Sequence, residues 1–312
     1  MLDGRKVLIT GHTGKIGGAI ATRYASKCEL WGLARYSREG SLAETERLGI
    51  RAVRGDLSLE GLAKVPTDFD YVINVGAAIA PRTAEEGMRS NSDGPARLMN
   101  HCKSAKAFLH VSTCGVYKQS SDPHHIFGED SDLGNAFEAM DSGQYVATKL
   151  AGEGAVRAAC FILGLPTIIC RQNVQYGGPH VPGGLVDYYL DRFVETGEAY
   201  LPSEGPFITS LIHEDDICDL VEPSLAAAAV PAEIVNWSSD EYTNWQELFE
   251  YAGELLGKAP SFVRTTEFDF PAYCADGTKR RRIAGPSKVT WKEGVRRSLK
   301  LRHPELVLNT PV

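Results

Sequence analysis

Short apolar runs alternate with helical patterns along the chain up to about Arg171. Several of these runs are apolar at consecutive positions, as expected for strands that helices cover on both faces. The alternation predicts parallel β-α-β units, which right-handed crossovers join into an open, doubly wound sheet. The expected strands are Lys6–Thr10, Leu30–Ala34, Ala52–Gly55, Tyr71–Val75, Ala107–Ser112 and Thr167–Arg171. The expected helices are Ile16–Ser26, Ser41–Leu48, Pro95–Lys103 and Ser142–Leu163.

The pattern changes after Arg171. The segment Tyr176–Gly184 is rich in Gly and Pro and is predicted to be a loop. A strand-like piece, Glu233–Asn236, and a helix, Trp245–Leu256, follow among shorter pieces. We therefore predict an α/β protein: a Rossmann-type domain at residues 1–171, and a smaller, mixed substrate lobe at 172–312, parts of which return to the first domain. A small-molecule substrate is expected in a cleft between them.

Composition and charge exclude several classes of protein. Of 312 residues, 43% are apolar and 23% charged, as in folded globular proteins. The net charge of -7 argues against a nucleic-acid partner, because phosphate contacts need clustered Lys and Arg. We interpret the one dense basic run, Lys279–Arg282, as solvated surface. No apolar run approaches the roughly 20 residues of a membrane span, which argues against a membrane protein.

The cysteines and the N-terminus suggest a cellular location. The seven cysteines form no CxxC pair and no His/Cys cluster with zinc spacing. The first expected strand begins at Lys6, which leaves no room for a signal peptide. We therefore expect reduced thiols, no metal site and a cytoplasmic protein.

The segment Thr10–Gly17 (TGHTGKIG) ends the first expected strand and opens the first expected helix. Glycines permit a tight turn there and let the backbone approach a pyrophosphate at the helix N-terminus. The GxxGxxG spacing directly after an apolar strand therefore predicts a dinucleotide site. The residues expected to contact the cofactor in this loop are Gly11, Thr13, Gly14, Lys15, Ile16 and Gly17.

The end of the second strand indicates which dinucleotide is bound. Many dinucleotide folds carry an acidic residue there that binds the adenosine 2′-hydroxyl. Here the strand ends in Arg35, whose guanidinium can pair with a 2′-phosphate, and Lys15 adds positive charge. NADP is favoured, with NAD as the alternative, since Arg35 could instead only stack on adenine.

Tyr145 and Lys149 form a YxxxK pattern at the start of the long expected helix. Residues four apart share one helix face, so the hydroxyl and the ammonium point into one site. An isolated tyrosine has a pKa near 10, too high for a base at neutral pH. A lysine charge about 5 Å away contributes roughly 3 kcal/mol at a dielectric of 20, which predicts a tyrosine pKa about two units lower. Tyr145 is therefore expected to act as general base in oxidation and general acid in reduction.

Together these motifs resemble the extended short-chain dehydrogenase/reductases, the family of nucleotide-sugar epimerases and dehydratases. The resemblance covers nearly the whole chain. Segments that resemble family motifs are Asp56-Leu57, Asn74–Ala78, Asn91–Gly94, Ser112–Tyr117, Arg171–Gly177 and Leu211–Asp216. The tail, from Pro271–Asp276 to His303-Pro304, looks most like that of UDP-galactose 4-epimerases.

The resemblance implies roles for individual residues. Thr113 would complete a catalytic set with Tyr145 and Lys149 by hydrogen-bonding the reacting oxygen. The further cofactor contacts that it implies are Asp56 and Leu57 at the adenine, then Gly76, Ala77, Ala78, Tyr145, Lys149, Gln172 and Val174. The substrate contacts that it implies are Ala80, Asn91, Cys114, Gly115, Asn173 and His213.

Departures from the family pattern narrow the function. The 4,6-dehydratases carry Asp-Glu after the catalytic threonine, where this chain has Cys114 and Gly115, so we exclude dehydration. Nucleotide-sugar enzymes usually have a diphosphate-binding arginine three residues before the His213 equivalent, where this chain has Ser210. Val174 replaces an asparagine of the family. The last two losses weaken the case for a nucleotide-sugar substrate.

Three hypotheses follow. The first is an NAD(P)-dependent oxidoreductase that transfers hydride at a secondary alcohol or ketone. The second is a UDP-sugar 4-epimerase that retains its NAD, which the tail favours. The third is a non-catalytic dinucleotide-binding regulator, against which the complete set of Thr113, Tyr145 and Lys149 argues. A homodimer formed through two helices of each subunit would suit the family resemblance.

Overall fold

The computed structural model describes residues 1–134, 143–179, 184–268 and 270–309. The chain divides into two compact units. The first unit comprises Met1–Val116, Met140–Arg171 and Cys218–Val235. The second unit comprises Tyr117–Ala139, Gln172–Ile217 and Asn236–Val312. The chain thus passes between the units several times, and a late segment returns to the first.

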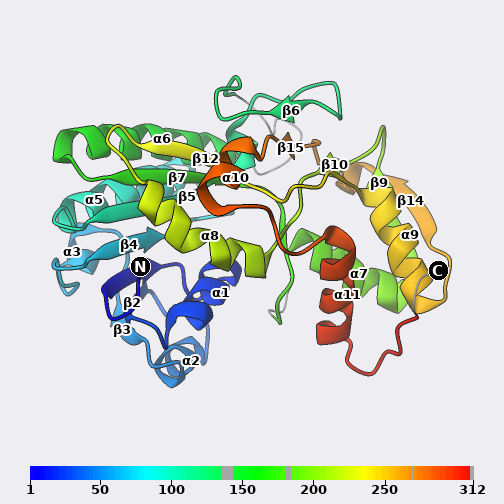
Figure 1. The fold of residues 1–312 in the computed structure, drawn as a ribbon, viewed down its shortest axis with the longest axis horizontal. Helices are drawn as coiled ribbons and strands as arrows, with labels where there is room; N and C mark the ends of the chain where they lie inside the picture. The colour runs from blue at the N-terminus through cyan, green and yellow to red at the C-terminus, as the bar shows by residue number, and fades with distance from the viewer. Residues whose placement is uncertain (135–142, 180–183, 269, 310–312) are drawn as a thin grey trace. The chain divides into compact units, whose positions relative to one another are not determined.

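A seven-stranded sheet forms the centre of the first unit (Figure 1). Its strands are β1 (Lys6–Thr10), β2 (Glu29–Ala34), β3 (Arg51–Arg54), β4 (Tyr71–Asn74), β5 (Ala107–Thr113), β7 (Thr167–Gln172) and β12 (Glu233–Trp237). The order is β12-β7-β5-β4-β1-β2-β3, with β1 parallel to both β2 and β4. The strand order reverses between β1 and β4. In open α/β sheets ligands bind at this switch point, beyond the carboxyl ends of the strands.

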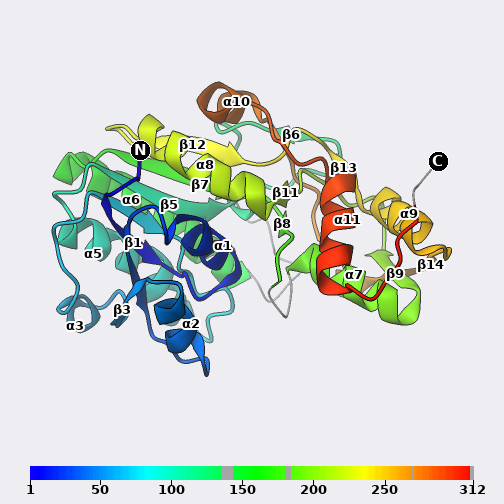
Figure 2. The same cartoon turned by 60° about the horizontal axis from the view of Figure 1, so that its bottom comes forward.

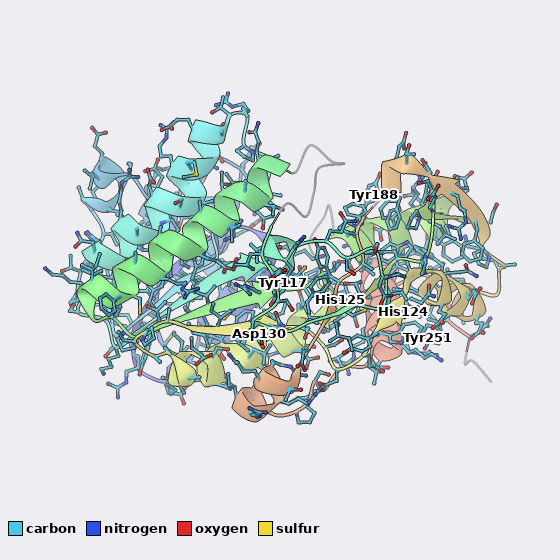
Figure 3. All side chains as sticks on the ribbon, turned by 90° about the horizontal axis from the view of Figure 1, so that it is seen from above. Tyr117, His124, His125, Asp130, Tyr188 and Tyr251 are labelled. Atoms are coloured by element: carbon cyan, nitrogen blue, oxygen red, sulfur yellow. The ribbon has the colours of Figure 1, made fainter. Side chains whose placement is uncertain are left out.

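Helices cover both faces of this sheet. They are α1 (Lys15–Tyr24), α2 (Ser41–Arg47), α3 (Leu59–Leu62), α4 (Ala84–Met88), α5 (Gly94–His101), α6 (Gly143–Leu163) and α8 (Glu214–Ala227). The views in Figures 1 and 3 show α5 and α6 side by side on one face, where Met99 and Val156 join the apolar core. On the other face the Tyr24 hydroxyl of α1 donates to the Cys218 carbonyl of α8 at 3.0 Å.

The fold class predicted from the pattern is confirmed. Each of the six expected strands of the sheet lies within one residue of its expected ends, and each expected helix lies within two. The helix Trp245–Leu256 (α9) has the expected bounds. The pattern did not predict the short helices α3 and α4, nor the π-helical turn Arg89–Asp93 that joins α4 to α5.

Short strand pairs and helices build the second unit. The pairs are β6 (Ile126–Phe127) with β15 (Cys274–Ala275), β8 (Gln175–Tyr176) with β11 (Ile212–His213), β9 (Glu198–Pro202) with β14 (Ser261–Thr265), and β10 (Ile208–Thr209) with β13 (Thr243–Asn244). The helices are α7 (Leu185–Thr196), α9, α10 (Thr278–Ala284) and α11 (Trp291–Arg302). Aromatic rings dominate its core, where the rings of Trp245 and Phe268 stack with their centres 5.0 Å apart. Across the described parts of both units, we find no helix whose length and apolar character would let it span a membrane.

Candidate active site

The phosphate loop packs tightly against the residues that follow β4. Gly11 has a φ of 70°, and a Cβ there would lie 2.5 Å from the backbone nitrogen of Gly76. A Cβ at Gly17 would lie 2.3 Å from the carbonyl oxygen of Gly11. Both clashes are with backbone atoms, so only glycine fits at these two positions. The GxxGxxG turn therefore serves close approach of the backbone.

The N-terminus of α1 suits a phosphate group. The helix begins at Lys15 after the exposed Gly14, which provides no side-chain cap, and its first turn has no acidic residue. The first N–H groups and the positive end of the helix dipole therefore attract an anion. Thr13 and Ile16 lie half-buried on either side of this start. These residues fit the pyrophosphate of a dinucleotide.

A buried polar chain lies under the loop. The N–H of Gly76 donates to Thr10 Oγ1 at 3.1 Å, and the Thr10 hydroxyl donates to Asn74 Oδ1 at 2.6 Å. Asn74 Nδ2 lies 2.9 Å from His110 Nδ1. Burial holds the pKa of His110 well below its ordinary value, so the ring is neutral and Nδ1 accepts. These polar contacts join β1, β4 and β5 at the end of the sheet where the candidate site lies.

Asp56 and Arg35 lie near each other beyond β2 and β3. Asp56 Oδ1 accepts from the backbone N–H and the hydroxyl of Ser58 at 2.9 and 2.5 Å. These bonds, with the nearby Arg35 charge, hold the pKa of Asp56 below its ordinary value. Leu57 is fixed by close packing, since a Cβ at Gly94 would lie 2.8 Å from Leu57 Cβ. Arg35 itself is exposed.

Asn91 fixes the backbone after β4. Its Oδ1 accepts from the Ala78 N–H at 2.8 Å, and its Nδ2 donates to the Ala78 carbonyl and to Thr148 Oγ1, each at 3.0 Å. The side chain is buried, and the substrate contact that the family resemblance implied for it stays a prediction. Asn91 is a positioning residue that ties Gly76–Ala78 to α6. The exposed Ala77 and Ala80 lie in the same segment.

Thr113 ends β5, and Tyr145 and Lys149 lie in the first turns of α6. Thr113 lies close enough to Tyr145 to lower the pKa of its hydroxyl. Lys149 is only 1% exposed, and its Nζ donates to the carbonyl of Val111 on β5 at 2.7 Å. Helix spacing thus places the tyrosine and the lysine on the face of α6 that meets β5.

The pKa of Tyr145 moves in the direction opposite to the expected one. Burial, with a smaller effect of Cys114, raises it to about 12, although the neighbouring Thr113 side chain lowers it. Burial also lowers the pKa of Lys149 to about 8, against the effect of Glu153. The expected lowering assumed a lysine charge about 5 Å from the hydroxyl and took no account of burial, whereas Lys149 is bonded to the Val111 carbonyl and burial raises the tyrosine pKa. Tyr145 therefore carries its proton at neutral pH, the form that a general acid needs.

Cys114 and Gly115 begin the 3-10 turn that follows Thr113. The N–H of Gly115 donates to Thr113 Oγ1 at 3.2 Å, which orients the hydroxyl. Burial raises the pKa of the Cys114 thiol to about 12, so the thiol is neutral. Neither residue supplies the acid and base that elimination of water requires.

Four expected site residues, Gln172, Asn173, Val174 and His213, lie in the second unit. Asn173 is buried, with Nδ2 donating to the Tyr273 carbonyl at 2.9 Å and Oδ1 accepting from Thr209 at 2.7 Å. His213 is buried too, and its Nδ1 accepts from the Asp215 N–H at 3.1 Å.

The amide of Asn173 and Nδ1 of His213 are thus engaged within the second unit. Their implied substrate contacts stay predictions. Gln172 is buried, and Val174 packs against the aromatic core.

The second unit also contains the position where nucleotide-sugar enzymes carry an arginine. Ser210 is buried there, and its hydroxyl accepts from the Ala275 N–H at 3.0 Å. Two other arginines of the second unit are bonded within the protein. Arg192 Nη2 donates to the Tyr200 hydroxyl at 2.5 Å, and Arg264 Nη1 donates to the Pro202 carbonyl at 3.0 Å.

A buried ion pair that the sequence pattern did not predict lies one helical turn after Lys149. Glu153, one helical turn after Lys149, receives three hydrogen bonds of 2.8 to 3.2 Å from Arg171 at the end of β7. The two side chains are 3% and 1% exposed. A signal was present, since Arg171 is a charge at the end of an otherwise apolar strand and Glu153 extends the Tyr145–Lys149 face of the helix.

Comparison with known proteins agrees with this geometry. The sequence model of the NAD dependent epimerase/dehydratase family matches residues 7–236. The chain belongs to this family. The resemblance to extended short-chain dehydrogenase/reductases is thereby confirmed. The family is named for dependence on NAD.

Individual family members resemble the chain at low identity. A trifunctional UDP-glucose 4,6-dehydratase/UDP-4-keto-6-deoxy-D-glucose 3,5-epimerase/UDP-4-keto-L-rhamnose-reductase of Arabidopsis thaliana is 22% identical over 95% of this chain and 47% of that protein. The chain spans about half the length of the first curated relatives it matches.

Solved structures share the fold. A UDP-glucuronic acid 4-epimerase from Bacillus cereus in complex with NAD has a TM-score of 0.78 and 19% identity, over 95% of this chain and 99% of that one. A UDP-N-acetylglucosamine 4-epimerase from Methanobrevibacter ruminantium has a TM-score of 0.81 and 18% identity, over 96% and 98%. At these identities the likeness establishes the fold alone.

Proposed function

We propose that this family member is an NAD(P)-dependent oxidoreductase that transfers hydride at a secondary alcohol or ketone. The observation that carries the proposal is that Thr113 lies near Tyr145, while Lys149, one helical turn after Tyr145 on α6, donates to Val111 on the same strand as Thr113. A dinucleotide bound at Gly11–Gly17 would supply or accept the hydride. The protein would supply the proton and hold the substrate oxygen.

Each of the three side chains has a separate role in this proposal. Tyr145, protonated at neutral pH, donates its proton to a carbonyl oxygen during reduction and takes it back during oxidation. Thr113, held by the Gly115 N–H, hydrogen-bonds the same oxygen. Lys149 keeps a positive charge beside the site, because with a pKa of about 8 it is mostly protonated at pH 7.

We further propose that the dinucleotide is NADP. The exposed guanidinium of Arg35 lies at the end of β2, where an acidic residue would instead bind a ribose hydroxyl. Its charge acts on Asp56, which the family resemblance places at the adenine. NAD remains the alternative, and the similar B. cereus epimerase is a complex with NAD.

The substitution Tyr145→Phe tests the central role. It removes the proton donor, so hydride transfer from NADPH to a ketone should fall by about 10²–10⁴ while the NADPH dissociation constant stays within twofold. A panel of ketones identifies the substrate with the wild type, and absorbance of reduced nicotinamide follows turnover. Tyr24→Phe is the matched control, since it also removes a buried tyrosine hydroxyl but far from this chemistry. Near wild-type turnover in Tyr145→Phe would remove Tyr145 from the mechanism.

A UDP-sugar 4-epimerase is the second candidate, supported by the names of similar structures. Two residues argue against it: the buried Ser210 stands where nucleotide-sugar enzymes usually have an arginine, and Arg35 stands where many dinucleotide folds have an acidic residue. The two functions differ in how the cofactor is held. An epimerase retains its nicotinamide through the reaction, whereas an oxidoreductase exchanges it. Dilution followed by gel filtration separates them: release of bound cofactor supports the oxidoreductase, and retention supports the epimerase.

A further inference from the structure

Tyr36 directly follows Arg35 and has an unusual backbone conformation. Its φ is 51°, in the left-handed region that bulky residues rarely adopt. Nevertheless its side chain is buried. Strained conformations of this kind persist where the surroundings determine them, and they gather at ligand sites. The left-handed residue turns the chain immediately after the arginine proposed to bind the 2′-phosphate.

Hydrogen bonds to the ring hydroxyl hold Tyr36 in place. Tyr36 Oη donates to the Gly32 carbonyl on β2 at 2.8 Å, and His12 Nε2 lies 3.1 Å from the same oxygen. Because the one hydroxyl proton goes to Gly32, His12 Nε2 is the donor in the second bond. The imidazole fills the space beside Gly32, where a Cβ would lie 2.6 Å from the ring.

His12 belongs to the phosphate loop, directly after Gly11. Its bond to Tyr36 therefore joins the loop that faces the pyrophosphate to the segment that faces the adenosine ribose. Burial lowers the pKa of His12 to about 4, so the imidazole is neutral at neutral pH and this bond is not charged. The two binding segments are consequently fixed relative to each other before any cofactor arrives.

Strand β3 forms one edge of the sheet (Figure 2). Its last residue, Arg54, completes this arrangement. Its Nη1 donates to the carbonyl of Arg35 at 2.9 Å, and its guanidinium lies 5.7 Å from the centre of the Tyr36 ring. Both contacts are with uncharged groups, and Arg54 has no carboxylate partner in the part of the chain that the structure describes. By contrast, Arg38 pairs with Glu44 at 2.5 Å and Arg51 with Glu29 at 2.9 Å. The charge of Arg54 is therefore held in place without being neutralised.

We propose that Arg54 is a second arginine of the 2′-phosphate site, next to Arg35, and that Tyr36 and His12 are positioning residues that hold both. Strand register supports this, because Arg54 pairs with Ala34, the residue before Arg35. The inference rests on the proposed preference for NADP. A planar guanidinium held by its backbone contact keeps further N–H groups for phosphate oxygens.

Fluorescence titration with NADPH and NADH tests the proposal, because the two cofactors differ only in the 2′-phosphate. Arg54→Gln should weaken NADPH binding about tenfold, the loss of one charge-assisted hydrogen bond, and leave NADH within twofold. Tyr36→Phe keeps the ring under Arg54 but removes the hydrogen bonds of its hydroxyl with Gly32 and His12. This variant should weaken the binding of NADPH by about threefold relative to the binding of NADH. Arg51→Gln is the matched control on the same strand and should change neither constant.

Each outcome bears on one claim. A wild type that binds NADPH no more tightly than NADH overturns the NADP preference itself. A wild type that prefers NADPH, with an Arg54→Gln variant that keeps the full preference, overturns the second arginine and leaves the NADP preference standing. If Tyr36→Phe weakens the binding of NADPH and NADH equally, the proposed positioning role of Tyr36 is overturned. If Tyr36→Phe does not fold, Arg54→Gln alone decides.

Discussion

Replacing Glu153 with glutamine tests whether the buried ion pair beside Lys149 supports the fold. Glu153 and Arg171 are 3% and 1% exposed and share three hydrogen bonds. Glu153→Gln leaves the guanidinium buried without its counter-charge. Removing one partner of a buried pair costs about 3–5 kcal/mol, and the remaining amide oxygen, which still accepts a bond, places the expected loss near 3 kcal/mol.

Urea unfolding of the cofactor-free protein measures this loss against two controls. Glu293→Gln makes the same change in an exposed pair with Arg297, where the expected loss is below about 1 kcal/mol. The double variant Glu153→Met with Arg171→Met removes both charges and should recover most of the stability, since apolar replacements of buried pairs are often neutral. If Glu153→Gln loses no more than Glu293→Gln, the pair does not support the fold as argued.

The same variant has a second readout at Lys149. The Glu153 carboxylate raises the pKa of the lysine, against burial, which lowers it to about 8. Without the carboxylate the ammonium loses a favourable interaction, so its pKa falls further. The upper pH limit of turnover, where Lys149 loses its proton, should therefore move to lower pH in Glu153→Gln. A limit that stays in place or moves to higher pH would contradict the electrostatic role of Glu153.

Two further substitutions test positions of the site. Arg35→Asp should shift preference from NADP toward NAD, because a carboxylate repels a 2′-phosphate and accepts from a ribose hydroxyl; unchanged relative affinities in titrations of both cofactors would show that Arg35 does not face the ribose. Thr148→Val keeps the shape but leaves the buried Asn91 amide without its 3.0 Å partner, so unfolding in urea should show a loss of about 1–3 kcal/mol, whereas a loss near zero would mean that the amide finds another partner.

The sequence predicted those parts of the fold that depend on local pattern. The strands of the central sheet are apolar at consecutive positions, and their ends follow from where that pattern stops. The tight turn of the phosphate loop was predictable because a Cβ at Gly11 or Gly17 would clash with backbone atoms, so only glycine fits at these positions. The placement of Tyr145 and Lys149 on one face of α6 was predictable from helix spacing.

Other features depend on contacts between distant residues. The π-helical turn that carries Asn91 forms where Gly152 of α6 packs against it, since a Cβ there would lie 2.1 Å from the Asn91 carbonyl. No periodicity in Arg89–Asp93 predicts such packing. The pKa of Tyr145 was likewise set by burial, which sequence spacing does not give. The side-chain amide of Asn173 donates to the carbonyl of Tyr273, which lies a hundred residues away in the chain.

Calorimetry with UDP, UDP-glucose and UDP-galactose tests the central claim, that the substrate is an alcohol or ketone other than a nucleotide sugar. Ser210 is bonded to Ala275, and Arg192 and Arg264 are engaged with Tyr200 and Pro202, so a diphosphate would lack charge-assisted hydrogen bonds worth about 1.5–3 kcal/mol each. We expect no detectable binding of UDP at millimolar concentration. Micromolar binding of UDP that is lost in Arg192→Ala or Arg264→Ala would contradict the account and make the epimerase the better reading.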